Sequence, residues 1–221
     1  HGVTIRLVGG AGISGCLLNN EQMGEGWSDY YALLTTIKAE DSEELPRGIA
    51  TYYRGVGSLG GGVRDYPYST DFALNPLTYD SIKTLGMPHG VGTVWAEMLW
   101  EMTWGLINTY GFDPNLYSFT GDISQDPGNV MAMAIVTEAL KFTPCNPGFV
   151  DARDAIMTAA REIYSDEILC VLWRAFAKRG LGFSAFQGVS TNLLDGFESY
   201  DIPPNTAVFR ISRDQLCDTA R

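Results

Sequence analysis

One stretch of the chain, residues 88–111, constrains the fold more than any other. Large apolar side chains in GVGTVWAEMLWEMTWGLINTYG occupy most sides of a helical wheel. A helix that is apolar nearly all round is stable only when other elements cover it. We therefore expect a largely buried helix that starts near His89 and ends at Gly111. The side chains behind this expectation are those of Val94, Met98, Trp100, Trp104 and Ile107.

Helical signals recur in other parts of the chain. Apolar residues follow a helical spacing after Glu25, as far as Ile37, and again over residues 129–142. Asn146 and Pro147 are a typical helix cap and first-turn proline for a helix that reaches Ile163. Residues 165–179 form another helix, which Gly180 ends. These segments bring the expected number to at least five helices.

Strand signals are few, and turn-forming residues are many. Residues 55–75 contain a cluster of five glycines and a proline, which predicts a long, ordered surface loop. Only residues 207–211 alternate in the manner of a strand. The sequence therefore predicts a mainly α fold with long loops and little strand.

Composition narrows the class of protein. The chain has 221 residues, of which 45% are hydrophobic, and this is enough for a full core. With no repeat and no low-complexity tract, residues 1–221 are expected to form a single unit. A formal net charge of −11 disfavours nucleic acid and anionic membranes as partners. No apolar run is long enough to cross a bilayer, and no signal peptide opens the chain.

The four cysteines bear on the cellular environment. None stands in a C-x-x-C pair, which disfavours a structural zinc ribbon, and the even number permits two disulfides in any of three connectivities. An acidic chain rich in Trp and Tyr with few cysteines suits a secreted enzyme. A reduced cytosolic protein with buried thiols is the alternative. The cysteines are Cys16, Cys145, Cys170 and Cys217.

Two carboxylates near the start of the first expected helix could carry chemistry. Glu25 and Asp29 are four residues apart and therefore share one helix face. An exposed acidic helix start is one interpretation, because negative charge favours the helix dipole there. Gly24 and Gly26 favour another, because glycine in a helix is usually tolerated where something approaches the backbone closely.

Ordered blocks of sequence extend from these residues over about 180 positions. They begin with His1-Gly2, Arg6-Leu7, Gly9-Gly10, Cys16-Leu17 and MGEGWSD at 23–29, and they continue with NPLTY at 75–79, His89, GTVWA at 92–96, PCNP at 144–147, DARDAI at 151–156 and Trp173 with AFAKRGLG at 175–182. In this order the blocks resemble the fungalysin family of secreted zinc metallopeptidases, relatives of thermolysin.

The resemblance implies a role for His1, for Glu25 and for Asp29. In that family an H-E-x-x-H helix supplies two zinc ligands and the general base, and a Glu in the G-E-G-W block is the third ligand. His1 would then be the second histidine of the motif and Glu25 the third Zn²⁺ ligand. Asp29, one turn further on, would orient a ligand imidazole. The chain would be the C-terminal, helical lobe of a thermolysin-like catalytic domain.

Four further residues complete the expected site. The resemblance implies that His89 is a catalytic donor to the tetrahedral oxyanion, and a helix-capping or core histidine is the alternative. Arg64, Tyr66 and Tyr68, in RDYPYST, could line the substrate cleft and hold a peptide carbonyl. Packing of an ordered loop would also explain these three residues.

The same resemblance limits what this chain does by itself. Its first residue is His1 and not Met, which fits a processed product or a fragment. The first histidine and the base glutamate of the motif would lie upstream, so we expect the chain alone to bind zinc weakly and to hydrolyse nothing. The implied partners are a protein or peptide substrate, an upstream lobe and a removable N-terminal propeptide. The implied location is extracellular.

Two interpretations from other classes compete with a peptidase. A free N-terminal histidine offers an amine and an imidazole, so His1 and His89 could form the copper brace of an oxidase. That brace belongs to β-sandwich enzymes, and the helical periodicity points away from them. A noncatalytic helical interaction module is the other alternative, with Glu97 and Glu101 as solvated charges at i and i+4.

Overall fold

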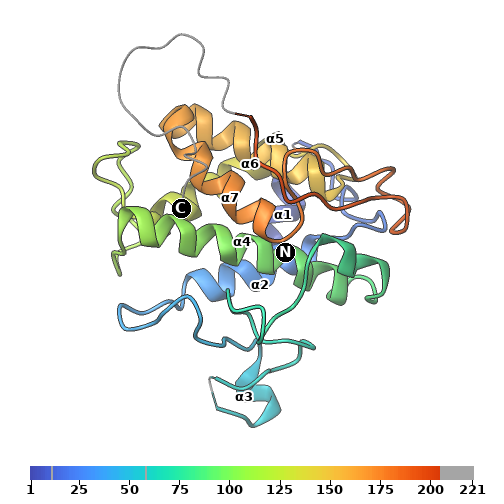
Figure 1. Cartoon of the computed structure of the whole chain (residues 1–221), viewed down its shortest axis with the longest axis horizontal. Coiled ribbons are helices and arrows are strands. Elements are labelled where there is room, and N and C mark those ends of the chain that lie inside the picture. Colours follow the sequence, from blue (N-terminus) through green and yellow to red (C-terminus); the bar gives the residue numbers. More distant parts are fainter. Residues whose placement is uncertain (11, 58, 205–221) are drawn as a thin grey trace.

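A single helix forms the centre of the molecule. In the computed structural model, which describes residues 1–10, 12–57 and 59–204, α4 (His89–Tyr110) runs through the middle of the fold (Figure 1). Three helices pack against it: α2 (Gly24–Leu34), α5 (Gly128–Phe142) and α7 (Leu169–Lys178). The remaining helical elements are α1 (Gly2–Leu7), α3 (Thr51–Arg54), η1 (Tyr79–Lys83), α6 (Phe149–Tyr164), which packs on α5, and η2 (Asp166–Ile168).

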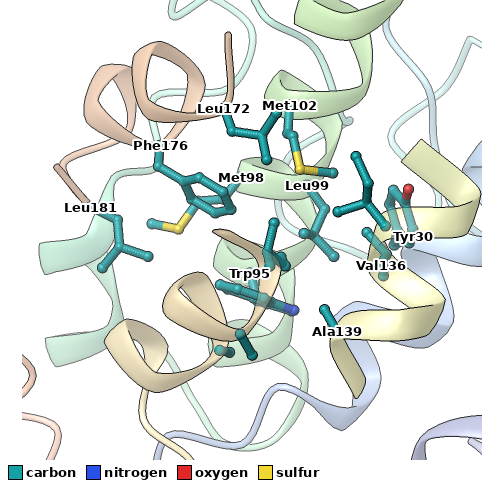
Figure 2. Close-up of a cluster of buried hydrophobic side chains, with 14 of the residues drawn as sticks. Tyr30, Trp95, Met98, Leu99, Met102, Val136, Ala139, Leu172, Phe176 and Leu181 are labelled. Atoms are coloured by element: carbon teal, nitrogen blue, oxygen red, sulfur yellow. The ribbon is translucent and has the colours of Figure 1, made fainter. Parts of the chain in front are cut away.

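The surrounding helices bury the apolar run that the sequence singles out. Trp95 is fully buried and makes edge contacts with Trp27 of α2 and with Phe149 of α6, at ring-centroid distances of 5.6 and 5.4 Å. It also stacks on Phe176 of α7, at 6.1 Å. Figure 2 shows this cluster, in which side chains of α4 lie among buried side chains of α2, α5 and α7. The prediction of a buried central helix is confirmed, and no described helix is long and apolar enough to cross a membrane.

Helix boundaries differ from the expected ones in three places. The single helix expected over residues 165–179 is the 3-10 turn η2 followed by α7. α2 ends at Leu34, before Ile37, because the hydroxyls of Thr35 and Thr36 donate to the carbonyls of Tyr31 and Ala32 and so compete with the helical bonds. The predicted cap of α6 is wrong. Asn146 adopts a left-handed φ of 56°, and its backbone N–H donates to the Cys16 carbonyl. The helix cap is instead Gly148, whose N–H donates to Asp151.

Long connections join the helices, as predicted. Over residues 35–57 and 59–78 the only helix is the four-residue α3, which projects from the body of the fold (Figure 1). Within the described residues, β-structure is limited to isolated bridges, such as that between Arg47 and Tyr68. The mainly α class with little strand is therefore confirmed. The expected strand at 207–211 lies outside the described residues.

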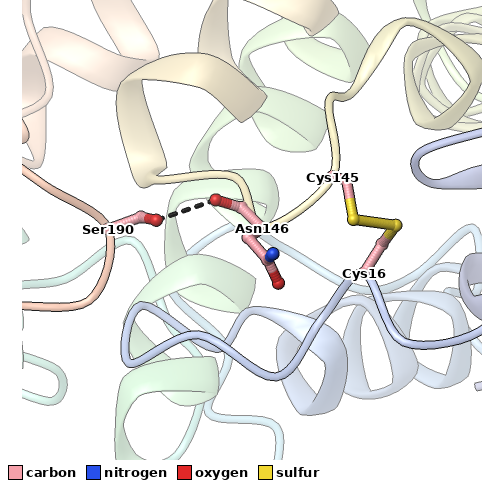
Figure 3. Close-up of a disulfide and its surroundings, with 4 residues drawn as sticks. All are labelled: Cys16, Cys145, Asn146 and Ser190. Atoms are coloured by element: carbon pink, nitrogen blue, oxygen red, sulfur yellow. Dashed lines mark hydrogen bonds between the residues drawn. A yellow bond between two sulfur atoms is a disulfide. The ribbon is translucent and has the colours of Figure 1, made fainter.

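A disulfide ties the N-terminal segment to the far end of α5. Cys16 and Cys145 are bonded across a sequence separation of 129, and Cys170 is disulfide-bonded as well (Figure 3). Gly9 packs directly on the first bridge with a φ of +76°, and a Cβ there would lie 2.2 Å from the Cys16 sulfur. The bridge therefore fixes the segment between α1 and α2. The paired cysteines agree with the expected disulfides and contradict buried free thiols for Cys16, Cys145 and Cys170.

The expectation that Glu97 and Glu101 are solvated is wrong. Their side chains are 0% and 5% exposed, and both bind the fully buried Arg179, at 2.9 and 2.7 Å. The same guanidinium donates to the carbonyls of Ser69 and Leu77. Burial is possible here because Arg179 has two carboxylates and several carbonyls around it, and each glutamate has a cation beside it. This network attaches residues 69–77 to α4.

Candidate metal centre

Two glycines bring α2 and α4 into backbone contact. A Cβ built on Gly26 would lie 2.2 Å from the Gly92 carbonyl oxygen, and one on Gly92 would lie 2.8 Å from the Glu25 Cβ. No larger residue fits at this crossing without a shift of the helices. The crossing places Glu25 beside the first turn of α4, where His89 is the first residue. The close approach expected from the glycines around Glu25 is thus observed at Gly26.

The Glu25 carboxylate lies between two imidazoles and a guanidinium. Its Oε1 is 3.3 Å from Nε2 of His1 and 3.7 Å from Nε2 of His89. Its Oε2 accepts a hydrogen bond from Arg64 at 3.3 Å. The side chains of His1 and His89 are 54% and 63% exposed, whereas that of Glu25 is 22% exposed. One carboxylate oxygen is therefore held by the protein, and the other faces two ring nitrogens at an open surface.

His1 stands at the start of α1, and Ser28 of α2 holds its other side. The Ser28 hydroxyl is 3.1 Å from Nδ1 of His1 and also accepts from the His1 backbone nitrogen, at 3.2 Å. The His1 carbonyl accepts a bond from Thr4 within the helix. The His1 ring thus spans the gap between Ser28, on its Nδ1 side, and Glu25, on its Nε2 side.

Asp29 is bound by Arg64 and Tyr68. Arg64 makes a two-pronged contact, with Nε to Oδ2 at 2.6 Å and Nη2 to Oδ1 at 2.8 Å. The Tyr68 hydroxyl donates to Oδ2 at 2.6 Å. Burial and the neighbouring carboxylate raise the pKa of Tyr68 well above its ordinary value, so the phenol stays protonated. The hydrogen bonds that Arg64 donates to Asp29 likewise raise the pKa of the Arg64 guanidinium.

The predicted site residues form one group with different exposures. Within the described residues, Asp29 hydrogen-bonds to neither His1 nor His89, so its role as an orienter of a ligand imidazole remains a prediction. Tyr68 is fully buried and reaches Asp29, and Tyr66 is partly buried against the core. Among the three predicted cleft residues, only Arg64 contacts Glu25 in the described structure.

The donor atoms of His1 and Glu25 suit a zinc ion. Tetrahedral zinc with bonds of about 2.0–2.1 Å separates its ligand atoms by about 3.3–3.4 Å, and imidazole nitrogen and carboxylate oxygen are both common zinc ligands. The observed 3.3 Å between His1 Nε2 and Glu25 Oε1 agrees with that separation. His89 Nε2, at 3.7 Å from the same oxygen, is further away. The part of the chain that is described holds no group of three or more His, Cys, Asp or Glu suited to a metal, so the pair is an incomplete ligand set.

Sequence reasoning missed two features of this site. The Ser28 contact with His1 leaves no signature beyond a serine three residues after Glu25. The buried network of Arg179 was detectable in principle, because Glu97 and Glu101 are the two acidic residues of an otherwise apolar helix. That network holds residues 69–77 against α4. Tyr68, the residue directly before this segment, donates a hydrogen bond to Asp29.

Comparisons with known proteins show the family of the chain. Residues 1–185 match the family described as Fungalysin metallopeptidase (M36). The chain is 43% identical over 187 residues to "Extracellular metalloproteinase 10" of Coccidioides posadasii and 41% identical over 187 residues to "Extracellular metalloproteinase mep" of Aspergillus fumigatus. Each alignment covers 84% of this chain and 29% of the relative. "Extracellular metalloproteinase 2" of Phaeosphaeria nodorum is 41% identical over 207 residues, which cover 92% of this chain and 31% of that protein. The chain thus spans less than a third of the length of these relatives.

Proposed function

The chain belongs to the fungalysin (M36) metallopeptidase family, and from this premise we propose that it supplies the helical half of a zinc endopeptidase active site. His1 and Glu25 bind the metal through Nε2 and Oε1. The observation that carries the proposal is the 3.3 Å separation of these two atoms at an open surface. A further histidine ligand and a general base come from outside this chain, whose 221 residues contain two histidines.

The bound metal and the surrounding residues divide the work. Zinc held by two histidines and a glutamate keeps a position for water, lowers the pKa of that water to about 7 and polarises a scissile carbonyl. Arg64 holds Oε2 of Glu25, which leaves Oε1 free to bind. It also links Glu25 to Asp29, so both carboxylates keep one orientation. Fixed ligands reduce the reorganisation needed during the reaction.

The proposal gives His89 the role of stabilising charge on the substrate. It is the first residue of α4, and its side chain is 63% exposed beside Glu25. A hydrogen bond from its Nε2 to the carbonyl oxygen of a bound peptide stabilises the negative charge that develops there. Arg64 and Tyr66 belong to the loop beside this surface and contact the peptide backbone in the proposal.

The relatives indicate the setting of the reaction. Their names describe extracellular metalloproteinases, and the proposal extends extracellular release and protein or peptide substrates to this chain. An upstream lobe completes the cleft, and a removable propeptide precedes it. The copper alternative needs Nδ1 and the backbone nitrogen of His1 on one metal with His89. Both atoms instead contact Ser28, and His1 presents Nε2 to the side that His89 shares.

Zinc content and proteolysis of the full-length gene product test the proposal. The wild type is expected to bind one zinc and to digest casein until a chelator removes the metal. Glu25→Gln loses zinc affinity and activity together, whereas His89→Gln keeps zinc and loses about 10²- to 10³-fold in kcat, the typical cost of one oxyanion donor. Glu40→Gln, at an exposed position, is the matched control and leaves both unchanged.

Two results would overturn the proposal. One is a Glu25→Gln variant that binds zinc as tightly as the Glu40→Gln control. The other is tight one-to-one zinc binding or casein hydrolysis by the 221-residue chain alone, since that chain lacks a ligand and the base.

A further inference from the structure

The Ser28 hydroxyl lies between a carbonyl oxygen and a ring nitrogen of His1. A serine hydroxyl has one hydrogen to donate and two lone pairs that accept. Ser28 Oγ is 3.0 Å from the Gly24 carbonyl oxygen and 3.1 Å from Nδ1 of His1. A carbonyl oxygen only accepts, so the single hydrogen of Ser28 points to Gly24. Nδ1 of His1 must therefore donate to Ser28.

This arrangement determines which ring nitrogen of His1 carries the proton. If Nδ1 lacked its hydrogen, Ser28 could satisfy either Gly24 or Nδ1 and would lose the other contact. With the hydrogen on Nδ1, both contacts are hydrogen bonds and Nε2 keeps its lone pair. That lone pair faces Oε1 of Glu25 across 3.3 Å. Two electron-pair donors facing each other at this distance are stabilised by a cation bound to both.

We propose that Ser28 is a positioning residue that fixes His1 as the Nδ1–H tautomer and so presents Nε2 to the metal. The inference rests on the proposed zinc function and adds the residue that orients one of its ligands. Metal-ligating histidines usually donate their second N–H to a protein acceptor, and the loss of that acceptor typically costs 10- to 100-fold in metal affinity. Ser28 plays this part from the same helix that carries Glu25.

The position of Ser28 on α2 explains why one residue can serve both ligands. Glu25 and Ser28 are three residues apart and therefore neighbours on one helix face. The bond to Gly24 holds the Ser28 hydroxyl in a single rotamer. His1 is thus held by two side chains of one rigid helix, and its ring is fixed at both nitrogens. Asp29, the next residue, is occupied by Arg64 and Tyr68.

The test compares three variants of the full-length gene product. Ser28→Ala removes the acceptor, and Ser28→Thr keeps a hydroxyl in the same place. Thr35→Ala is the matched control, because Thr35 makes the same kind of bond to the carbonyl four residues earlier, at 2.7 Å, and lies away from the site. Zinc affinity is measured by competition with a chromophoric chelator. Proton–nitrogen NMR of the zinc-loaded full-length gene product reports the Nδ1–H of His1, and its nuclear Overhauser contacts with Ser28 assign it.

Ser28→Ala is expected to weaken zinc binding 10- to 100-fold and to expose Nδ1–H to rapid exchange with water. Ser28→Thr restores both, and Thr35→Ala changes neither. The inference fails if Ser28→Ala binds zinc as tightly as Thr35→Ala, or if Nδ1–H exchanges rapidly in the wild type. If Glu25→Gln binds zinc as tightly as the wild type, the proposed function is overturned instead. The two failures are therefore distinguishable.

Discussion

The contact between α2 and α4 yields a graded prediction from three glycines. A Cβ at Gly26 would lie 2.2 Å from the Gly92 carbonyl oxygen, about 1.2 Å short of ordinary contact at 3.4 Å. A Cβ at Gly92 would lie 2.7 Å from the Gly26 nitrogen, about 0.7 Å short. A Cβ at Gly24 would meet only a Leu17 methyl at 3.8 Å. Gly26→Ala therefore pushes the two helices apart more than Gly92→Ala does, and Gly24→Ala does not push them apart.

The energetic consequence follows the same order. Alanine in a helix gains roughly 0.5–1 kcal/mol over glycine, but overpacking costs about 1–3 kcal/mol and occasionally more. Gly26→Ala should lower the free energy of unfolding by about 2 kcal/mol or more, and Gly92→Ala by about 1 kcal/mol. Gly24→Ala should be neutral or slightly stabilising. Because a misplacement of about 1 Å can cost about 100-fold in rate, Gly26→Ala should also weaken zinc binding by moving Glu25 against His89.

Urea unfolding measures the stability of each full-length variant, and chelator competition measures its zinc affinity. The expected ranking of the losses is Gly26→Ala, then Gly92→Ala, then Gly24→Ala, in both stability and zinc affinity. If Gly26→Ala and Gly24→Ala are equally stable and bind zinc equally, the backbone contact does not position Glu25, and the reasoning is refuted.

Three further predictions concern the scaffold. Arg179→Met leaves the buried Glu97 without its cation and Glu101 with Lys178 alone, and it should destabilise the fold by about 3–5 kcal/mol in urea unfolding; Arg161→Met, at an exposed ion pair, should cost at most about 1 kcal/mol. Burial raises the pKa of Glu21 from 4.5 to about 7, so its contribution to stability is full below about pH 4.5 and is lost as the pH rises to about 7, by at most about 3 kcal/mol. Glu21→Gln should flatten this part of the stability-versus-pH curve, and an unchanged slope would contradict the assignment. Replacing Cys16 and Cys145 with serine should cost about 2–5 kcal/mol, because the bridge closes a loop with a separation of 129 residues; equal unfolding midpoints with and without the bridge would contradict it.

The sequence predicted the elements whose signals are local. α4 was predicted from apolar side chains on most of its faces, because such a helix is stable only when other elements cover it. The start of α6 was mispredicted because Asn146 and Pro147 form a typical cap, whereas the neighbouring disulfide at Cys145 fixes the chain in another direction. A cap signal extends over three or four residues and contains no information about a partner 129 positions away.

The candidate site shows the same division. Family resemblance marked His1, Glu25, Asp29 and His89, and the block RDYPYST suggested Arg64. The structure brings these residues together, with His1 and His89 exposed and Asp29 buried. The sequence alone could not show that Arg64 bridges Glu25 and Asp29, because that contact depends on the path of a glycine-rich loop. The burial of Glu97 and Glu101 depends likewise on Arg179, which is some 80 positions away and has no periodic relation to either glutamate.

Diffraction from the zinc-loaded full-length protein, recorded at the zinc absorption edge, tests the central claim most directly. We expect one anomalous peak at about 2.0–2.2 Å from both Nε2 of His1 and Oε1 of Glu25, the usual zinc–ligand distance. A peak at Nδ1 and the backbone nitrogen of His1, or at a site without Glu25, would contradict the claim that these two residues hold the catalytic metal.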